Sequence, residues 1–217
     1  MDVKAVITDW GGVLTSPLKD AVAHWLAADG IDEARYKAVM RAWVTQAYEP
    51  AAGVVNPIHG LEDGTLDPAE FERLLAAELC TVDGGPVACE GLLRRMFAAF
   101  HPVEPMYAAL RAARAAGARV ALLSNSWGND YPRELWGELF HAVVISSEVG
   151  LRKPDERIFR HAVELLGLHP AECAFVDDIE YNVRAAEAVG MVGVHHTDVP
   201  TTVGRLGDLL GVRLADC

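Results

Sequence analysis

Five short and nearly continuous apolar runs constrain the fold of this chain more than any other feature. They are residues 3–8 (VKAVIT), 119–123 (RVALL), 142–145 (AVVI), 173–176 (CAFV) and 191–194 (MVGV). Patterns typical of helices separate or follow the later runs, at residues 154–166, 179–189 and 199–210. Short apolar strands that alternate with helices indicate a parallel sheet covered on both faces. The sequence therefore predicts an α/β core built from residues 1–16 and 101–217.

The stretch between these two parts, residues 17–100, has no convincing strand pattern. Its apolar residues recur at helical spacing, as in Val22, Trp25 and Leu26. Asp67 followed by Pro68 is a strong start signal for a helix, because aspartate caps helices and proline fits their first position. Residues 53–64 carry glycine, proline and asparagine, which predicts a loop between helices. We therefore expect an all-helical insert after the first strand.

Charge and composition exclude several classes of partner. The 217 residues include 19 Lys and Arg against 31 Asp and Glu, a formal net charge of −12. Such a surface repels nucleic acid and anionic lipid, and no apolar run approaches the roughly 20 residues of a membrane span. The start of the chain lacks the apolar region of a signal peptide, and the four cysteines are scattered, so we expect a cytoplasmic protein with reduced thiols. An anionic substrate would need a local positive site, built with a metal ion.

Polar residues follow four of the predicted strands or lie in the loops after them. They are Asp9, the pair Ser124 and Asn125, Lys153, and the pair Asp177 and Asp178. Ligands of open parallel sheets bind at the carboxyl ends of the strands, so these residues should converge. Several carboxylates at one edge repel each other unless a cation lies among them, and oxygen ligands suit Mg²⁺. An aspartate held ionised beside Mg²⁺ and lysine is able to act as a nucleophile.

Four segments of the chain resemble the signature motifs of the haloacid dehalogenase-like hydrolase superfamily, in order and at similar spacing. These segments are ITDWGGVLT, LLSNS, GLRKPDERIF and FVDDIEYNVRAAEAVG. The chain is most similar to the subgroup that contains the N-terminal phosphatase domain of soluble epoxide hydrolase. The resemblance implies a Rossmann-like parallel sheet core, residues 1–16 and 101–217, with an inserted helical cap domain, residues 17–100.

The resemblance also implies a role for each site residue. Asp9 matches the nucleophile, and Lys153 matches the lysine that screens negative charge. Ser124 and Asn125 match the pair that binds the phosphoryl oxygens. The family's ligands of Mg²⁺ are matched by Asp9, the backbone carbonyl of Gly11, and Asp178 with Asp177. Asn182, one helical turn beyond Asp178, is expected either to orient the acidic loop or to lie on the surface of its helix.

Gly11 departs from the family pattern. The family usually has a second aspartate there, which protonates the leaving group and then activates water. Losing a general acid commonly costs about 10²–10⁴-fold in rate. The gap leaves three alternatives: substrates with good leaving groups, an acid from the cap such as His59, or a reaction that needs no acid.

The sequence thus favours a Mg²⁺-dependent phosphatase of a small phosphorylated metabolite, acting through an aspartyl-phosphate on Asp9. Two alternatives stay open. A haloacid dehalogenase-type hydrolase of carbon–halogen bonds would release halide without protonation, so Gly11 would be harmless. A catalytically weak phosphate-binding or regulatory module would have lost the acid altogether. The sequence carries no signal for a particular oligomeric state.

Overall fold

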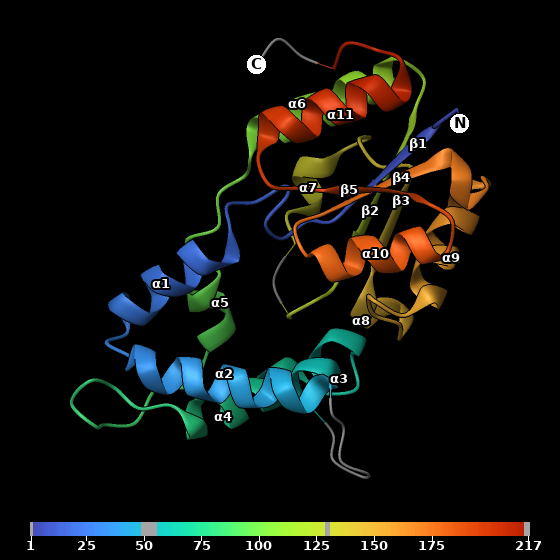
Figure 1. Ribbon diagram of the computed structural model, residues 1–217. Helices are drawn as coiled ribbons and strands as arrows, with labels where there is room; N and C mark the ends of the chain where they lie inside the picture. Colours follow the sequence, from blue (N-terminus) through green and yellow to red (C-terminus); the bar gives the residue numbers. More distant parts are fainter. Residues whose placement is uncertain (1, 49–55, 129–130, 215–217) are drawn as a thin grey trace. The chain divides into compact units, whose positions relative to one another are not determined.

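The computed structural model describes residues 2–48, 56–128 and 131–214 (Figure 1). The chain divides into two compact units. Unit 1 comprises Met1–Ser16, His101–Asn125 and Tyr131–Cys217, and unit 2 comprises Pro17–Phe100 and Ser126–Asp130. The chain therefore leaves unit 1 a second time, directly after Asn125, and returns to it at Tyr131.

Unit 1 is built on the predicted parallel sheet. Its strands are β1 Ala5–Thr8, β2 Arg119–Ser124, β3 Ala142–Ile145, β4 Cys173–Asp177 and β5 Val192–His195, in the order β3-β2-β1-β4-β5. Every neighbouring pair is parallel, and the central strand β1 is fully buried. Burial on both faces explains why these runs are continuously apolar instead of alternating. The predicted α/β class and the five strands are confirmed.

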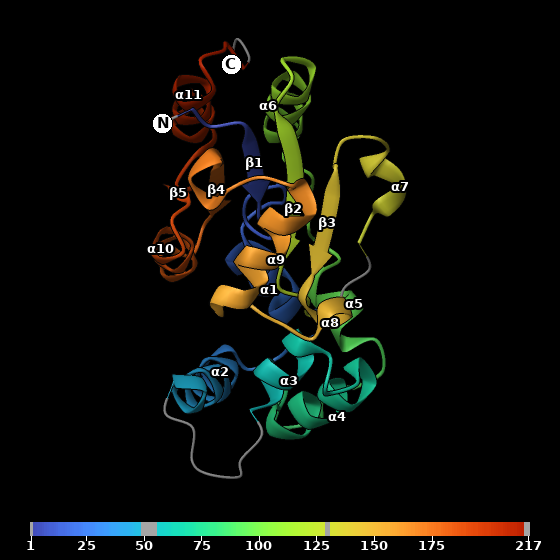
Figure 2. The ribbon, with the colours of Figure 1, turned by 90° about the vertical axis from the view of Figure 1, so that its right-hand side faces the viewer.

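Helices of unit 1 pack in two pairs around the sheet (Figures 1 and 2). The longer helices are α6 Glu104–Ala115, α9 Glu156–Leu166, α10 Glu180–Ala188 and α11 Val199–Leu210, and the short ones are α7 Arg133–Trp136, α8 Ser146–Val149 and the 3₁₀ turn Pro170–Glu172. Helix α9 contacts α10, and α6 contacts α11. The predicted helix at residues 154–166 begins two residues later, because the carboxylate of Asp155 caps it by accepting from the backbone N–H of Arg157.

One face of the sheet forms a core with α9 and α10. Alternate strand residues such as Ile7, Leu123 and Phe175 belong to it, and the ring of Phe175 lies edge-on to Phe159 of α9 with centroids 5.2 Å apart. Since successive strand side chains point to opposite faces, the intervening residues are buried on the other side. The sheet is therefore a buried base, packed on both faces, for the residues that follow its strands.

Unit 2 contains the helices α1 Leu18–Ala28, α2 Glu33–Tyr48, α3 Pro57–Asp63, α4 Pro68–Glu78 and α5 Leu92–Met96. Its core includes Trp25, Phe71 and Leu75, all fully buried or nearly so. The segment Ser126–Asp130 adds Trp127, whose indole N–H donates to Glu62 at 3.2 Å and whose ring lies edge-on to Phe71. No strand occurs in the parts of residues 17–100 that the structure describes, in line with the helical prediction.

The expected loop at residues 53–64 is wrong in its second half, which forms α3. Asn56 caps this helix, because its side-chain oxygen accepts from the backbone N–H groups of Ile58 and His59. Pro57 takes the first helical position, where a missing N–H costs nothing. His59 thus lies on a short helix. Residues 53–55 lie outside the described part of the chain.

Two further expectations concern cysteines and membranes. Cys80, Cys89 and Cys173 are free thiols, while Cys217 lies outside the described residues. In the ranges that the structure describes, none of the helices combines the length and the apolar character needed to cross a bilayer.

Candidate active site

The site begins at the carboxyl ends of the two central strands. Thr8, the last residue of β1, is in register with Val176 of β4, and the backbone N–H of Asp9 donates to the Val176 carbonyl at 2.8 Å. Parallel pairing in this register brings Asp9 and Asp177 to the same edge of the sheet. The sheet therefore brings together two carboxylates that are 168 positions apart in the sequence.

Lys153 joins these two carboxylates. Its ammonium nitrogen Nζ lies 2.8 Å from Oδ1 of Asp9 and 2.7 Å from Oδ2 of Asp177. The lysine is only 2% exposed, so both ion pairs form almost without water. A buried ammonium is stable only when paired in this way, so Lys153 is fixed between the two aspartates.

Asp177 is held by more than the lysine. Its Oδ1 accepts from the backbone N–H of Ile179 at 2.8 Å, and the side-chain amide of Asn182 donates to both carboxylate oxygens, at 3.2 and 3.1 Å. Asn182 is buried, so this contact is not a surface feature. The predicted interaction of Asn182 with the acidic loop is therefore present.

Gly12 allows Asp178 to approach the loop after β1. Gly12 has a φ of +74°, and a Cβ atom on it would lie 2.8 Å from Cγ of Asp178 and closer still to Oδ2. Only glycine fits both the left-handed backbone and this close contact. The backbone of Asp178 is also held by His195, whose Nε2 lies 3.0 Å from the Asp178 carbonyl oxygen.

The electrostatics of the site follow from burial and from the number of carboxylates. Burial raises the pKa of Asp9 to about 7; the ammonium of Lys153 opposes this rise, and the carboxylates of Asp177 and Asp178 add to it. Burial, together with the neighbouring carboxylate of Asp177, also raises the pKa of Asp178. The pKa of Lys153 is raised despite its burial, because two carboxylates face one ammonium. The site therefore has more negative charge than the lysine neutralises.

The oxygen atoms of the site fit a divalent cation. Asp9, Asp177 and Asp178 each offer a carboxylate oxygen, and these oxygens lie within 4.8 Å of one another. Hard cations such as Mg²⁺ prefer such oxygen donors. Both oxygens of Asp177 already accept hydrogen bonds from the protein, which leaves Asp9 and Asp178 as the better candidates for direct ligands.

Asn125 binds the backbone of Lys153. Its Oδ1 accepts from the Lys153 N–H at 2.8 Å, and its Nδ2 donates to the Lys153 carbonyl at 3.1 Å. This paired contact fixes the loop from which the lysine projects. The sequence motif signalled a polar residue at the strand end but gave no sign of this positioning contact.

Ser124, at the end of β2, is 2% exposed. Its Oγ lies 2.9 Å from the hydroxyl of Tyr131, a residue that the sequence analysis did not single out. Tyr131 stands in an irregular segment without a motif or a periodic pattern, so no sequence signal marked it. The structure thus adds one polar side chain to the neighbourhood of Ser124.

The loop residues after Asp9 differ in their surroundings. Trp10 is 7% exposed and lies edge-on to Tyr131, with ring centroids 4.9 Å apart, so it packs inside unit 1. A Cβ atom on Gly11 would meet no atom within 4 Å, and Gly11 is not among the glycines with positive φ. Neither backbone nor packing therefore requires glycine at position 11.

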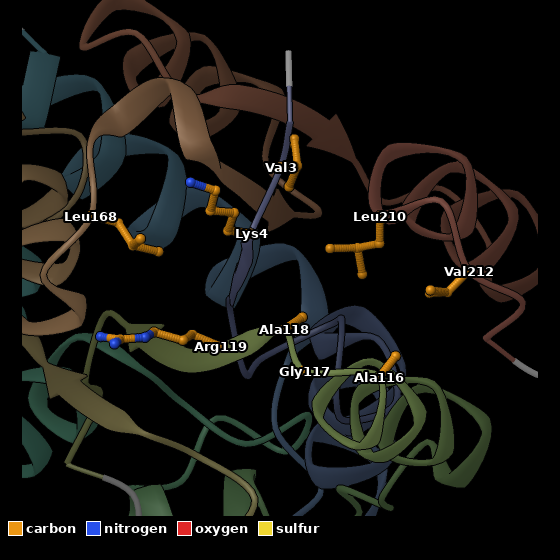
Figure 3. A pocket seen from close by; sticks show the side chains of 9 residues that line it. All are labelled: Val3, Lys4, Ala116, Gly117, Ala118, Arg119, Leu168, Leu210 and Val212. Carbon is orange, nitrogen blue, oxygen red and sulfur yellow. The ribbon is translucent and has the colours of Figure 1, made fainter.

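A cavity of about 360 Å³ lies elsewhere in unit 1 (Figure 3). Lys4 and Arg119, at the amino ends of β1 and β2, line it together with Leu168 and Leu210. Both cations already bind protein oxygens, Lys4 that of Glu172 and Arg119 that of Leu166. The cavity is at the opposite strand ends from Asp9 and takes no part in the candidate site.

The chain matches known proteins along most of its length. The model of the haloacid dehalogenase-like (HAD) hydrolase family matches residues 3–190. Sesquiterpene phosphatase astK of Aspergillus oryzae is 32% identical over 154 residues, which cover 69% of this chain and 77% of that protein. Bifunctional epoxide hydrolase 2 of Sus scrofa is 28% identical over 118 residues, which cover 51% of this chain and 21% of that protein.

A similar solved structure is that of the HAD family enzyme bt-2542 of Bacteroides thetaiotaomicron. It has a TM-score of 0.65 at 20% identity and covers 90% of this chain and 94% of its own. The same enzyme solved with magnesium and inorganic phosphate has a TM-score of 0.56 at 22% identity, over 89% of this chain and 93% of that one. The family indicated by the four motifs is thus confirmed: the chain belongs to the haloacid dehalogenase-like hydrolases.

Proposed function

We propose that this hydrolase is a Mg²⁺-dependent phosphatase that acts on a small phosphorylated metabolite. The observation that carries the proposal is the buried contact of Asp9 with Lys153, beside the carboxylates of Asp177 and Asp178. A nucleophile, a cation and a set of metal-binding oxygens are the groups that phosphoryl transfer through a carboxylate requires.

The relatives support the same chemistry. One is named a sesquiterpene phosphatase, and a protein of the same fold has been solved with magnesium and inorganic phosphate. We further propose that unit 1 is the core domain and that unit 2, mainly residues 17–100, is a cap domain that selects the substrate.

The donors proposed for Mg²⁺ are the carboxylates of Asp9 and Asp178 and the backbone carbonyl of Gly11. Asp177 supports this set through hydrogen bonds, because its own oxygens are occupied by Lys153, Ile179 and Asn182. When bound, Mg²⁺ supplies positive charge beside the phosphoryl oxygens.

In the proposed reaction, a carboxylate oxygen of Asp9 attacks phosphorus and the ester P–O bond breaks. The leaving alkoxide takes a proton from water, and an aspartyl-phosphate remains on Asp9. Water then attacks the phosphorus of this intermediate, which releases phosphate and regenerates the carboxylate. Lys153 opposes protonation of Asp9 and screens the phosphoryl charge, while the Ser124 hydroxyl and the backbone N–H of Asn125 hold the phosphoryl oxygens.

Gly11 leaves the alkoxide without an acid on the protein at that position. Aryl phosphates, whose phenolates leave readily, should therefore react faster than alkyl phosphates. Gly11→Asp should raise kcat/KM for alkyl phosphates by up to about 10²–10⁴-fold and change aryl phosphates little, since only the former need the proton. The open space around a Cβ at this position makes the variant sterically compatible with the fold. The test is to measure kcat/KM for a series of leaving groups with the natural protein and with Gly11→Asp. Equal gains in kcat/KM for alkyl and aryl phosphates would contradict the role of the missing acid at position 11.

The proposed function is tested by a panel of phosphorylated metabolites with Mg²⁺ and with EDTA. We expect Mg²⁺-dependent phosphate release, its loss in Asp9→Asn, and full activity in Asp83→Asn, a matched change of an exposed aspartate in unit 2. Turnover that survives in a pure Asp9→Asn preparation would exclude the covalent mechanism. Halide release from 2-haloacids without any phosphatase activity would favour the dehalogenase alternative.

A further inference from the structure

Tyr131 contacts the one hydroxyl that the proposed mechanism uses. The Tyr131 hydroxyl lies 2.9 Å from Oγ of Ser124, which is 2% exposed. The other oxygen near Ser124 Oγ is the carbonyl of Asn125, at the much longer distance of 3.4 Å. Tyrosine is thus the stronger of the two partners of this serine.

The position of Tyr131 is fixed by aromatic packing within unit 1. Its ring lies edge-on to Trp10, with centroids 4.9 Å apart, and tilted against Trp136 at 5.8 Å. Trp10 and Trp136 are 7% and 5% exposed. Because Trp10 directly follows Asp9, the same ring contacts link the loop of the nucleophile to the end of β2.

The placement of Tyr131 in the chain strengthens this interpretation. The chain leaves unit 1 after Asn125, contributes Ser126–Asp130 to unit 2 and re-enters unit 1 at Tyr131. Asn125 and Tyr131 bracket this excursion, and the hydroxyl of Tyr131 contacts Ser124, the residue that precedes Asn125. Tyr131 therefore holds the side chain of Ser124 at the end of β2, just before the chain leaves unit 1.

We propose that Tyr131 is a positioning residue for phosphate binding: its hydroxyl donates to Ser124 Oγ and thereby directs the single serine proton to a phosphoryl oxygen. A serine hydroxyl has one proton and two acceptor positions, so a donor on the tyrosine side leaves the serine proton for the ligand. The proposal deepens the proposed function and rests on it.

The test is a double-mutant cycle of Ser124→Ala and Tyr131→Phe, with inorganic phosphate as the probe in the presence of Mg²⁺. Calorimetric phosphate binding and competitive inhibition of aryl phosphate turnover are both measured. In the natural background, Tyr131→Phe should weaken phosphate binding and raise KM about two- to tenfold, as expected for one hydrogen bond, and change kcat less. In the Ser124→Ala background it should have no further effect, because the residue through which it acts is gone.

Tyr107→Phe is the matched control. Tyr107 is likewise a buried tyrosine beside Trp10 and Trp136, and its pKa is raised by burial and partly lowered again by these two indole groups. This variant should lower the melting temperature without coupling to Ser124→Ala. Equal phosphate affinity of the natural protein and Tyr131→Phe, or equal losses in both serine backgrounds, would overturn the positioning role. Absence of phosphate binding by the natural protein itself would instead overturn the proposed function.

Discussion

Replacing Gly12 by alanine should weaken both Mg²⁺ binding and folding stability, and Gly11→Ala provides the control at the neighbouring position. The two glycines are adjacent in the sequence, but their surroundings differ. A Cβ atom on Gly12 would lie 2.8 Å from Cγ of Asp178, whereas one on Gly11 would meet no atom within 4 Å. Gly12 also has a φ of +74°, and Gly11 does not have a positive φ.

The magnitude follows from these two facts. Carbon atoms pack best at about 3.5–4.0 Å, so the Asp178 carboxylate must retreat by about 1 Å to admit the methyl group. The left-handed backbone of a non-glycine residue adds about 1–2 kcal/mol of destabilisation. Loss of a group that only orients metal ligands typically costs about 10- to 100-fold in affinity, and since Gly12→Ala displaces a proposed ligand, we expect Mg²⁺ to bind it at least about 10-fold more weakly. Gly11→Ala should change stability by less than about 1 kcal/mol, in the stabilising direction, because alanine restricts the unfolded chain.

The assay combines calorimetric titration of Mg²⁺ with urea unfolding in EDTA, for the natural protein and both variants. The expected pattern is weak metal binding and lower stability in Gly12→Ala, with both quantities near natural in Gly11→Ala. If Gly12→Ala bound Mg²⁺ as tightly as Gly11→Ala, Asp178 would not be a ligand and the reason given for Gly12 would be refuted.

Three further predictions concern the buried charges and the thiols. Lys153→Met should lower the free energy of unfolding by about 3–5 kcal/mol in urea titrations, because it leaves Asp9 and Asp177 buried without their cation, and adding Asp9→Asn should restore part of the loss. In metal-free protein, the pKa of Asp9 is about 7, so the folded state keeps a proton that the unfolded chain releases near pH 4. The free energy of unfolding, measured by urea titration in EDTA, should therefore fall as the pH rises from about 4 to 7. Asp9→Asn should flatten this pH dependence. Peptide mapping after thiol labelling should find the exposed Cys89 modified quickly, while Cys173, whose pKa burial raises to about 11, should react only on unfolding.

The parts of the molecule that the sequence predicts well depend on local patterns. Continuous apolar runs predict all five strands. The positions of Asp9, Lys153 and Asp177 after these strands predict that they converge, and in the structure Lys153 forms ion pairs with both aspartates. The topology of a parallel sheet makes this step possible, because all strand ends of one direction meet at one edge.

The missed features depend on contacts between distant or irregular segments. The sequence does not predict helix α3, because the glycine, proline and asparagine of this segment are typical of a loop. The helix is stabilised by the Asn56 cap and by burial of Ile58 and Leu61. The residues between Ser124 and Tyr131 in the sequence include a segment of the other unit, so no periodic pattern predicts the contact of these two side chains. The Gly11–Gly12 pair shows the same limit, since only the position of Asp178 distinguishes the two glycines.

The charge of the site gives a physical reason for the proposed pairing of a cation with a phosphoryl group. Three carboxylates face one ammonium, so the fully ionised site has an excess of two negative charges. Without a cation, burial and the neighbouring carboxylates raise the pKa of Asp9 to about 7, and a protonated carboxyl group is a poor nucleophile. With the proposed function, a divalent cation would remove the excess, restore the ionised carboxylate of Asp9 and attract the phosphate dianion that the bare site would repel. Metal and phosphate must then strengthen each other's binding by the same factor, because coupling between two ligands of one protein is reciprocal.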